Sequence, residues 1–144
     1  MERRITPPRI TKLPEGYIFT FGSNEANRHG KGAAKQALRW GAIYYHKVHG
    51  LQGRTYAIPT KDKSIKTLPL VRIQAYVEEF IDFAISHPEL KFLVVEIGCM
   101  LAGYRPEQIA PFFKRAIDVE NIHLPRSFWQ VIKPSQIVVQ QKLF

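Results

Sequence analysis

KFLVVEIGCMLAGY, residues 91–104, is the stretch that decides the fold. Residues 91–97 form a nearly continuous apolar run, which predicts a strand buried on both faces, as in a parallel sheet. A glycine-bearing loop follows at residues 98–104, and Pro106 and Glu107 then open a helical pattern. Strand, glycine loop and helix in this order are typical of an α/β protein.

The same order of elements occurs near the start of the chain. Residues 17–21 are rich in β-forming side chains and lead into Phe21-Gly22-Ser23-Asn24. Residues 28–32, Arg-His-Gly-Lys-Gly, come next, and an alanine-rich helical pattern then runs to Trp40, with Gly41 as its C-cap. The chain therefore carries two glycine loops, each between a strand and a helix.

The remaining segments continue the alternation of strands and helices. We read residues 43–53 as a strand or a loop, residues 1–15 as an extended arm, and residues 134–144 as a tail or an edge strand. The other predicted elements are a short strand at 55–58 that Pro59 stops, a helix between Pro69 and Pro88, a short strand at 122–124, and short edge elements at 128–132 and 137–139. We expect one domain over residues 1–144, a three-layer α/β/α sandwich around a mixed, mainly parallel sheet.

The charge of the chain points to a phosphate-bearing partner. The net charge is +9, and residues 28–66 hold nine Lys or Arg residues but one acid, Asp62. Clustered positive charge attracts phosphates, although a solvated basic face without a partner has the same composition. In α/β sheets, ligands bind beyond the carboxyl ends of the strands, where both glycine loops are expected. Their backbone amides would suit a nucleotide or a sugar phosphate.

Other features of the composition bear on the location of the protein and on metals and cofactors. Cys99 is the single cysteine, and no apolar run reaches the roughly 20 residues that span a bilayer. We therefore expect a cytoplasmic protein with no membrane partner. His46 and His49 have no Cys or third ligand cluster nearby in the sequence, so we expect no metal site, and we expect no cofactor.

The glycine loops resemble those of macro domains, the ADP-ribose-binding modules. A closer resemblance is to a group of bacterial and phage macro-domain-like proteins, and it covers about Gly16 to Pro125. The motifs that carry it are Phe-Gly-Ser-Asn at 21–24, Arg-His-Gly at 28–30, Gly-Leu-Gln-Gly at 50–53, Ala-Ile-Pro-Thr-Lys-Asp at 57–62 and Leu-Ala-Gly-Tyr at 101–104.

The resemblance implies a macro-domain-like fold that binds ADP-ribose or a related NAD-derived nucleotide, free or on an ADP-ribosylated macromolecule. It also implies hydrolysis of an ADP-ribosyl linkage as an activity to test. Ala34 stands where many macro-domain hydrolases carry an acid, and Met100 stands where the closer group has glycine. The expected ligand-binding residues are Gly22, Ser23, Asn24, Arg28, Gly30, Gly32, Ala33, Lys61, Gly98, Cys99, Met100, Leu101, Ala102, Gly103 and Tyr104.

The candidate catalytic residues are Asn24, Asp62 and His29. Asn24 either contacts ribose hydroxyls or caps a turn. Asp62 is either a general base or a salt-bridged surface group, and His29 is either a proton-transfer group or a structural histidine. Similarly, Tyr104 either stacks on the ribose or belongs to the core.

Two alternatives to an ADP-ribose site remain open at this point. One is a non-enzymatic nucleic-acid-binding protein that uses the basic segment 28–66 and the N-terminal arm, although the chain has no recognised nucleic-acid-binding motif. The other is an accessory protein that sequesters a nucleotide signal without turnover.

Overall fold

The sheet of the computed structural model has five strands in the order β2-β3-β1-β4-β5. The structure describes residues 4–26, 28–42 and 49–133. The strands are β1 (Tyr17–Asn24), β2 (Gly50–Gln52), β3 (Thr55–Lys61), β4 (Lys91–Val94) and β5 (Ile122–His123). β1 pairs in parallel with β3 and β4, β4 pairs in parallel with β5, and β2 is antiparallel to β3. This confirms the mixed, mainly parallel sheet that the sequence predicts.

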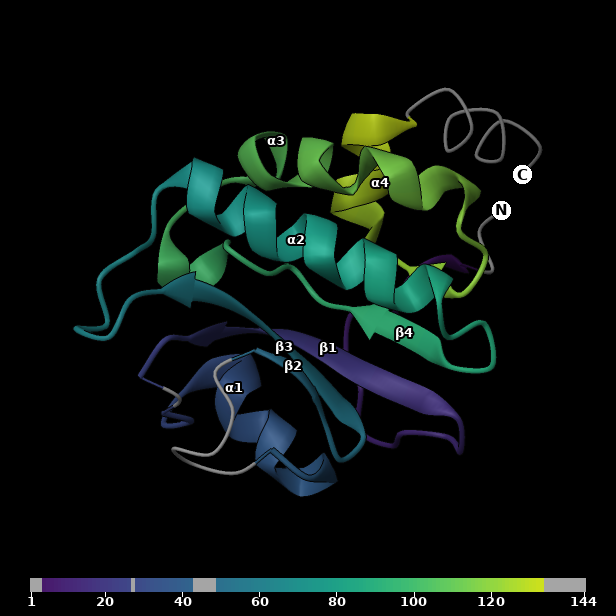
Figure 1. Cartoon of the computed structure of the whole chain (residues 1–144), viewed down its shortest axis with the longest axis horizontal. Helices are drawn as coiled ribbons and strands as arrows, with labels where there is room; N and C mark the ends of the chain where they lie inside the picture. The colour runs from purple at the N-terminus through teal and green to yellow at the C-terminus, as the bar shows by residue number, and fades with distance from the viewer. Residues whose placement is uncertain (1–3, 27, 43–48, 134–144) are drawn as a thin grey trace.

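Helices cover both faces of the sheet, so the molecule has the expected three layers (Figure 1). The short helix α1 lies on one face, and α2, α3 and α4 lie on the other. The helices are α1 (Gly32–Ala37), α2 (Leu70–Ile85), α3 (Pro106–Ile109) and α4 (Arg126–Ile132), with 3₁₀ helices η2 (Leu38–Trp40), η3 (Met100–Ala102) and η4 (Ala110–Asp118). None of the helices in the described residues is long and apolar enough to cross a membrane.

The central strand β1 supplies side chains to both halves of the core. Phe19 and Phe21 belong to the same cluster as Ala34 and Ala37 of α1, whereas Ile18 belongs to the cluster beneath α2. Successive side chains of a strand point to opposite faces, so an apolar run is buried on both sides when helices cover both sides. The sequence of β1 therefore requires the two helical layers.

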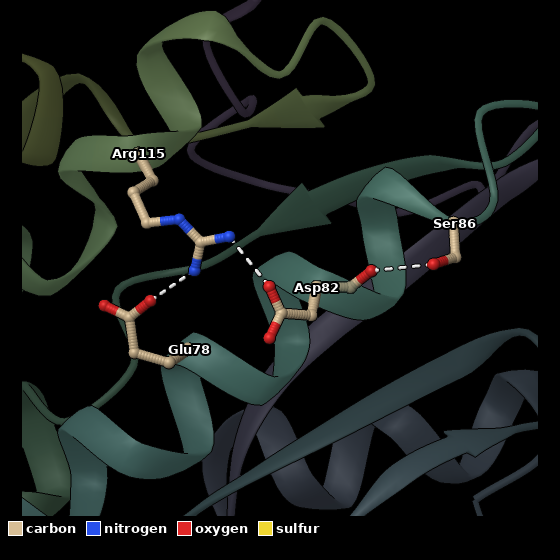
Figure 2. Close-up of polar contacts among 4 residues, drawn as sticks. All are labelled: Glu78, Asp82, Ser86 and Arg115. Carbon is tan, nitrogen blue, oxygen red and sulfur yellow. Dashed lines mark hydrogen bonds and ion pairs between the residues drawn. The ribbon is translucent and has the colours of Figure 1, made fainter.

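Helix α2 is held to η4 by an ion-pair cluster at the surface. The Arg115 guanidinium of η4 bonds Glu78 and also Asp82, whose Oδ1 is 2.7 Å away (Figure 2). Glu78 and Asp82 are four residues apart and hence lie on the same side of α2. Arg115 therefore belongs to this surface network.

The structure corrects several predictions of secondary structure. The first strand does not end at Gly22, because β1 continues to Asn24. Pro59 does not stop its strand, because β3 continues to Lys61 and Pro59 stands opposite Ser23 of β1. The pairing of β2 with β3 ends at Ala57, and beyond that point a strand tolerates a residue without an N–H group. Residues 128–132 are part of helix α4, not an edge element, and residues 137–139 lie outside the described residues.

The N-terminal segment packs onto the sheet edge beyond β5. Ile5 forms a parallel bridge with Leu124, and the Thr6 amide donates to Leu124 O at 2.8 Å. The Arg4 guanidinium donates to four carbonyl oxygens, those of Ala116, Ile117, Val119 and Ile122. The Trp129 indole of α4 donates to Arg4 O at 3.1 Å, so this segment also lies beside α4, and Ile5 to Pro8 line the cleft described below.

Candidate functional site

The two glycine loops meet in one cleft of about 1540 Å³ at the carboxyl ends of β1, β3 and β4. A Cβ placed on Gly32 would lie 3.1 Å from Leu101 Cδ1, so the two loops lie side by side. The predicted ligand-binding residues that line the cleft are Gly22, Ser23, Asn24, Arg28, Gly30, Gly32, Ala33, Lys61, Gly98, Cys99, Leu101 and Ala102. The structure therefore places most of the predicted binding residues around one space.

Asn24 closes the first loop with its own side chain. Its Nδ2 donates to Arg28 O at 2.8 Å, and its Oδ1 accepts from the Arg28 amide at 2.9 Å. The side chain is thus bonded in both directions to the backbone four residues ahead. Asn24 acts as a turn-closing residue that orients Arg28 at the cleft, and the structure gives it no separate catalytic position.

His29 lies in the core rather than in the cleft. Its side chain is 1% exposed, and its ring meets Phe21 edge-on with centroids 5.9 Å apart. A proton-transfer residue must reach the substrate directly or through a water molecule. The proposed catalytic role of His29 therefore has no support, and we read it as a structural histidine.

Asp62 does not line the cleft, and it holds the turn that follows β3. Its Oδ1 accepts hydrogen bonds from the amides of Ser64 at 2.8 Å and Lys66 at 3.0 Å. The hydrogen bond from the Lys66 amide is the largest cause of a pKa below the ordinary value for this carboxyl group. A general base works best with a pKa near the operating pH, so the structure argues against this role.

The second loop is built around Gly98, which has a φ of +74°. A side chain here would be strained, and its Cβ would lie 2.7 Å from Ile109 Cδ1. The Tyr104 amide closes the loop by donating to Gly98 O at 2.9 Å. Gly98 therefore allows the backbone to turn back along the cleft above the buried Ile109.

Some amides of the second loop are already used. Cys99 N donates to Glu96 O at 3.3 Å, and Ala102 N donates to Cys99 O at 3.0 Å. Ala102 therefore cannot supply its amide to a phosphate, contrary to the prediction. Gly98 lines the cleft and precedes η3, and among the described residues its amide makes no backbone bond outside the helices and strands, which leaves it as a donor for a ligand.

Tyr104 is a structural residue of this loop. Its hydroxyl donates to Leu68 O at 2.7 Å, next to the start of α2. Neither Tyr104 nor Gly103 lines the cleft. Met100 lies in the same loop, within η3. The predicted stacking of Tyr104 on a ribose is therefore not supported, and the alternative that it belongs to the core fits better.

Cys99 lines the cleft as a protonated thiol. Burial, followed by the negative charges of Glu96 and Glu107, raises its pKa to about 11. The thiolate is the nucleophilic form of cysteine, and it is scarce at neutral pH when the pKa is this high. The structure therefore assigns no nucleophilic role to Cys99.

We expect Cys99 to react slowly with iodoacetamide at pH 7.5. A pKa of about 11 instead of 9.0 lowers the thiolate fraction about 100-fold, and burial slows the reaction further. Mass spectrometry should show rapid labelling in urea and slow labelling of the folded protein, with the folded rate rising towards pH 10. Equal rates in the two states at pH 7.5 would contradict this assignment.

Several cleft residues were not predicted, because they come from segments remote in the sequence. Ile5, Thr6, Pro7 and Pro8 arrive with the N-terminal segment, and Pro125, Arg126 and Ser127 arrive with the start of α4. Ile65 arrives from the turn after β3, which Thr67 ties to the second loop through a 2.8 Å bond to Ala102 O. No motif in the sequence marks these residues as neighbours.

The charged side chains that line the cleft favour an anion. Within the described residues, they are Arg28, Lys31, Lys61 and Arg126 against one acid, Glu96. The described residues contain no group of three or more potential metal-binding side chains, and His46 lies outside them. The site is therefore a basic cleft with backbone donors and exposed cations.

Comparisons with known proteins bear on the fold alone. No protein-family model and no curated protein matches the chain. A solved structure of a protein of unknown function from Bacteroides thetaiotaomicron is similar, with a TM-score of 0.55 and 15% identity over 82% of this chain and 88% of that chain. At this identity the likeness supports a shared fold, and the resemblance to macro domains stays a prediction.

Proposed function

We propose that the cleft binds ADP-ribose or a related NAD-derived nucleotide. The observation that carries the proposal is the convergence of two glycine loops and four cationic residues on one cleft at the carboxyl ends of the parallel strands. Ligands of α/β proteins bind at this edge, and backbone amides together with Lys and Arg are the usual partners of phosphate. A diphosphate would lie between the loops, near Gly30, Gly32 and Gly98.

Binding is better supported than hydrolysis. Of the three candidate catalytic residues, Asn24 closes a turn, His29 lies in the core, and Asp62 holds the turn after β3 and does not line the cleft. A protein that sequesters a nucleotide without turnover is therefore the form of the proposal that the side chains favour. The ligand could be free or attached to an ADP-ribosylated macromolecule. The cytoplasmic location of the protein stays a prediction from the sequence.

Titration calorimetry tests this proposal directly. We expect ADP-ribose to release or absorb heat with a saturable isotherm, and we expect ADP to bind more weakly. Adenosine and ribose serve as matched ligands without phosphates and should not bind measurably. No saturable heat with ADP-ribose, NAD or ADP at about 1 mM, which corresponds to binding weaker than about −4 kcal/mol, would refute the proposal.

A nucleic-acid interface is the second candidate, and one observation favours it. Lys31, Lys35 and Arg39 are exposed and recur every four residues from the N-cap of α1 to η2, next to the exposed Arg28. Such a row would contact phosphates without reading base sequence. Oligonucleotide binding should then weaken steeply between 50 mM and 200 mM salt, whereas binding in the cleft should depend less on salt.

A further inference from the structure

Glu96 is the acidic side chain of an otherwise basic cleft, among the residues that the structure describes. It lies two residues after the end of β4 and two residues before Gly98, and its side chain is exposed. A carboxylate at this place would repel the phosphates that the surrounding cations attract. Its position therefore calls for a ligand that offers something other than phosphate oxygens.

Ser127, at the start of α4, holds Glu96 in place. The Ser127 hydroxyl, in the first turn of α4, donates a hydrogen bond to Glu96 Oε2. An ionised carboxylate accepts about four hydrogen bonds over its two oxygens, so the serine uses a small part of this capacity. The neutral donor fixes the carboxylate without neutralising its charge.

The negative charge of Glu96 acts on another residue that lines the cleft. After burial, it is the next largest cause of the raised pKa of Cys99, which lines the same cleft. Glu107 acts on the same thiol but does not line the cleft. Glu96 is therefore positioned to act on a bound molecule, and Glu107 provides a natural comparison.

We infer that Glu96 determines ligand specificity by accepting hydrogen bonds from the vicinal hydroxyls of a sugar. The inference rests on the proposed function and names its substrate class: a sugar joined to a diphosphate, in preference to a bare polyphosphate. Phosphates lie against the cations and the loop amides, and a neighbouring sugar donates its hydroxyls to the carboxylate. A ligand without such hydroxyls meets only repulsion at this position.

Replacement of Glu96 by glutamine tests this inference, with Glu107→Gln as the matched control. The measured quantity is the ratio of the Kd for inorganic pyrophosphate to the Kd for ADP-ribose, from calorimetry on the full chain. We expect Glu96→Gln to lower this ratio about 10-fold or more, since a charge-assisted acceptor is lost for the sugar and a repulsion is removed for pyrophosphate. Glu107→Gln should leave the ratio unchanged, and Ser127→Ala should lower it by a smaller factor.

The possible outcomes separate this inference from the proposed function. If Glu96→Gln leaves the ratio unchanged, or weakens both ligands equally, the role of Glu96 is wrong and the ADP-ribose site stands. If the wild-type protein binds pyrophosphate but not ADP-ribose, the sugar preference is refuted while a phosphate site remains. If it binds neither, the proposed function fails and the role of Glu96 fails with it. Thermal melting of each variant shows that a change in the ratio does not come from unfolding.

Discussion

Gly53→Ala is expected to lower the free energy of unfolding by about 2–4 kcal/mol, from left-handed backbone strain and overpacking together. Gly53 has a φ of +59°, and a Cβ there would lie 2.8 Å from both Gly41 Cα and Trp40 O. These are backbone atoms, and the Arg54 amide donates a hydrogen bond to Trp40 O at 2.7 Å, so they cannot easily move away from a new side chain. Gly41 faces the same contact, and Gly41→Ala should be similarly destabilising.

Urea unfolding measures this effect, and Gly30→Ala is the control. Gly30 has no positive φ, and a Cβ there would meet no atom within 4 Å. The same chemical change should therefore alter the midpoint very little at Gly30 and a great deal at Gly53. Equal midpoints for Gly53→Ala and the wild type would show that the contact between the two glycines is not as close as the structure has it.

Gly30→Trp is expected to weaken ADP-ribose binding about 100-fold or more, a loss of roughly 2.7 kcal/mol, without lowering stability. Gly30 lines the cleft, and the space around its Cα is open. An indole placed there would occupy part of the volume that the diphosphate needs. Gly30→Ala should have a small effect in the same direction.

Calorimetry with ADP-ribose gives the affinities, and thermal melting gives the stabilities. The control is Glu89→Trp, which adds the same side chain at an exposed position away from the cleft lining. We expect Glu89→Trp to bind as the wild type does. Wild-type affinity in Gly30→Trp would place the ligand elsewhere on the molecule.

The fold was predictable because the decisive signals are local. The apolar runs that became β1 and β4 are followed by Gly30 and Gly32 and by Gly98, after which the chain turns into helices, and the stripe of α2 follows the 3.6-residue period. Pro59 was misread because the effect of a proline depends on whether a neighbouring strand needs its missing N–H. Whether a neighbouring strand reaches Pro59 depends on the length of β2, and the sequence of β3 does not reveal that length.

The candidate site was predictable at its glycines but less so at its polar side chains. Both loops line the cleft, yet the partners of Asn24 and Asp62 turned out to be backbone groups within four residues. An asparagine or aspartate that closes a turn and one that contacts a ligand share the same sequence preferences. Glu96 and Ser127 meet across 31 residues, and no sequence spacing predicts that contact.

The most direct test of the central claim is an amide ¹H–¹⁵N NMR titration of the protein with ADP-ribose. The claim is that both glycine loops contact one bound diphosphate. We predict saturable shifts of the amide signals of Gly30 and Gly32 together with those of Gly98 and Leu101, all fitting one Kd. Shifts in one loop alone, or shifts confined to the exposed row along α1, would contradict the account.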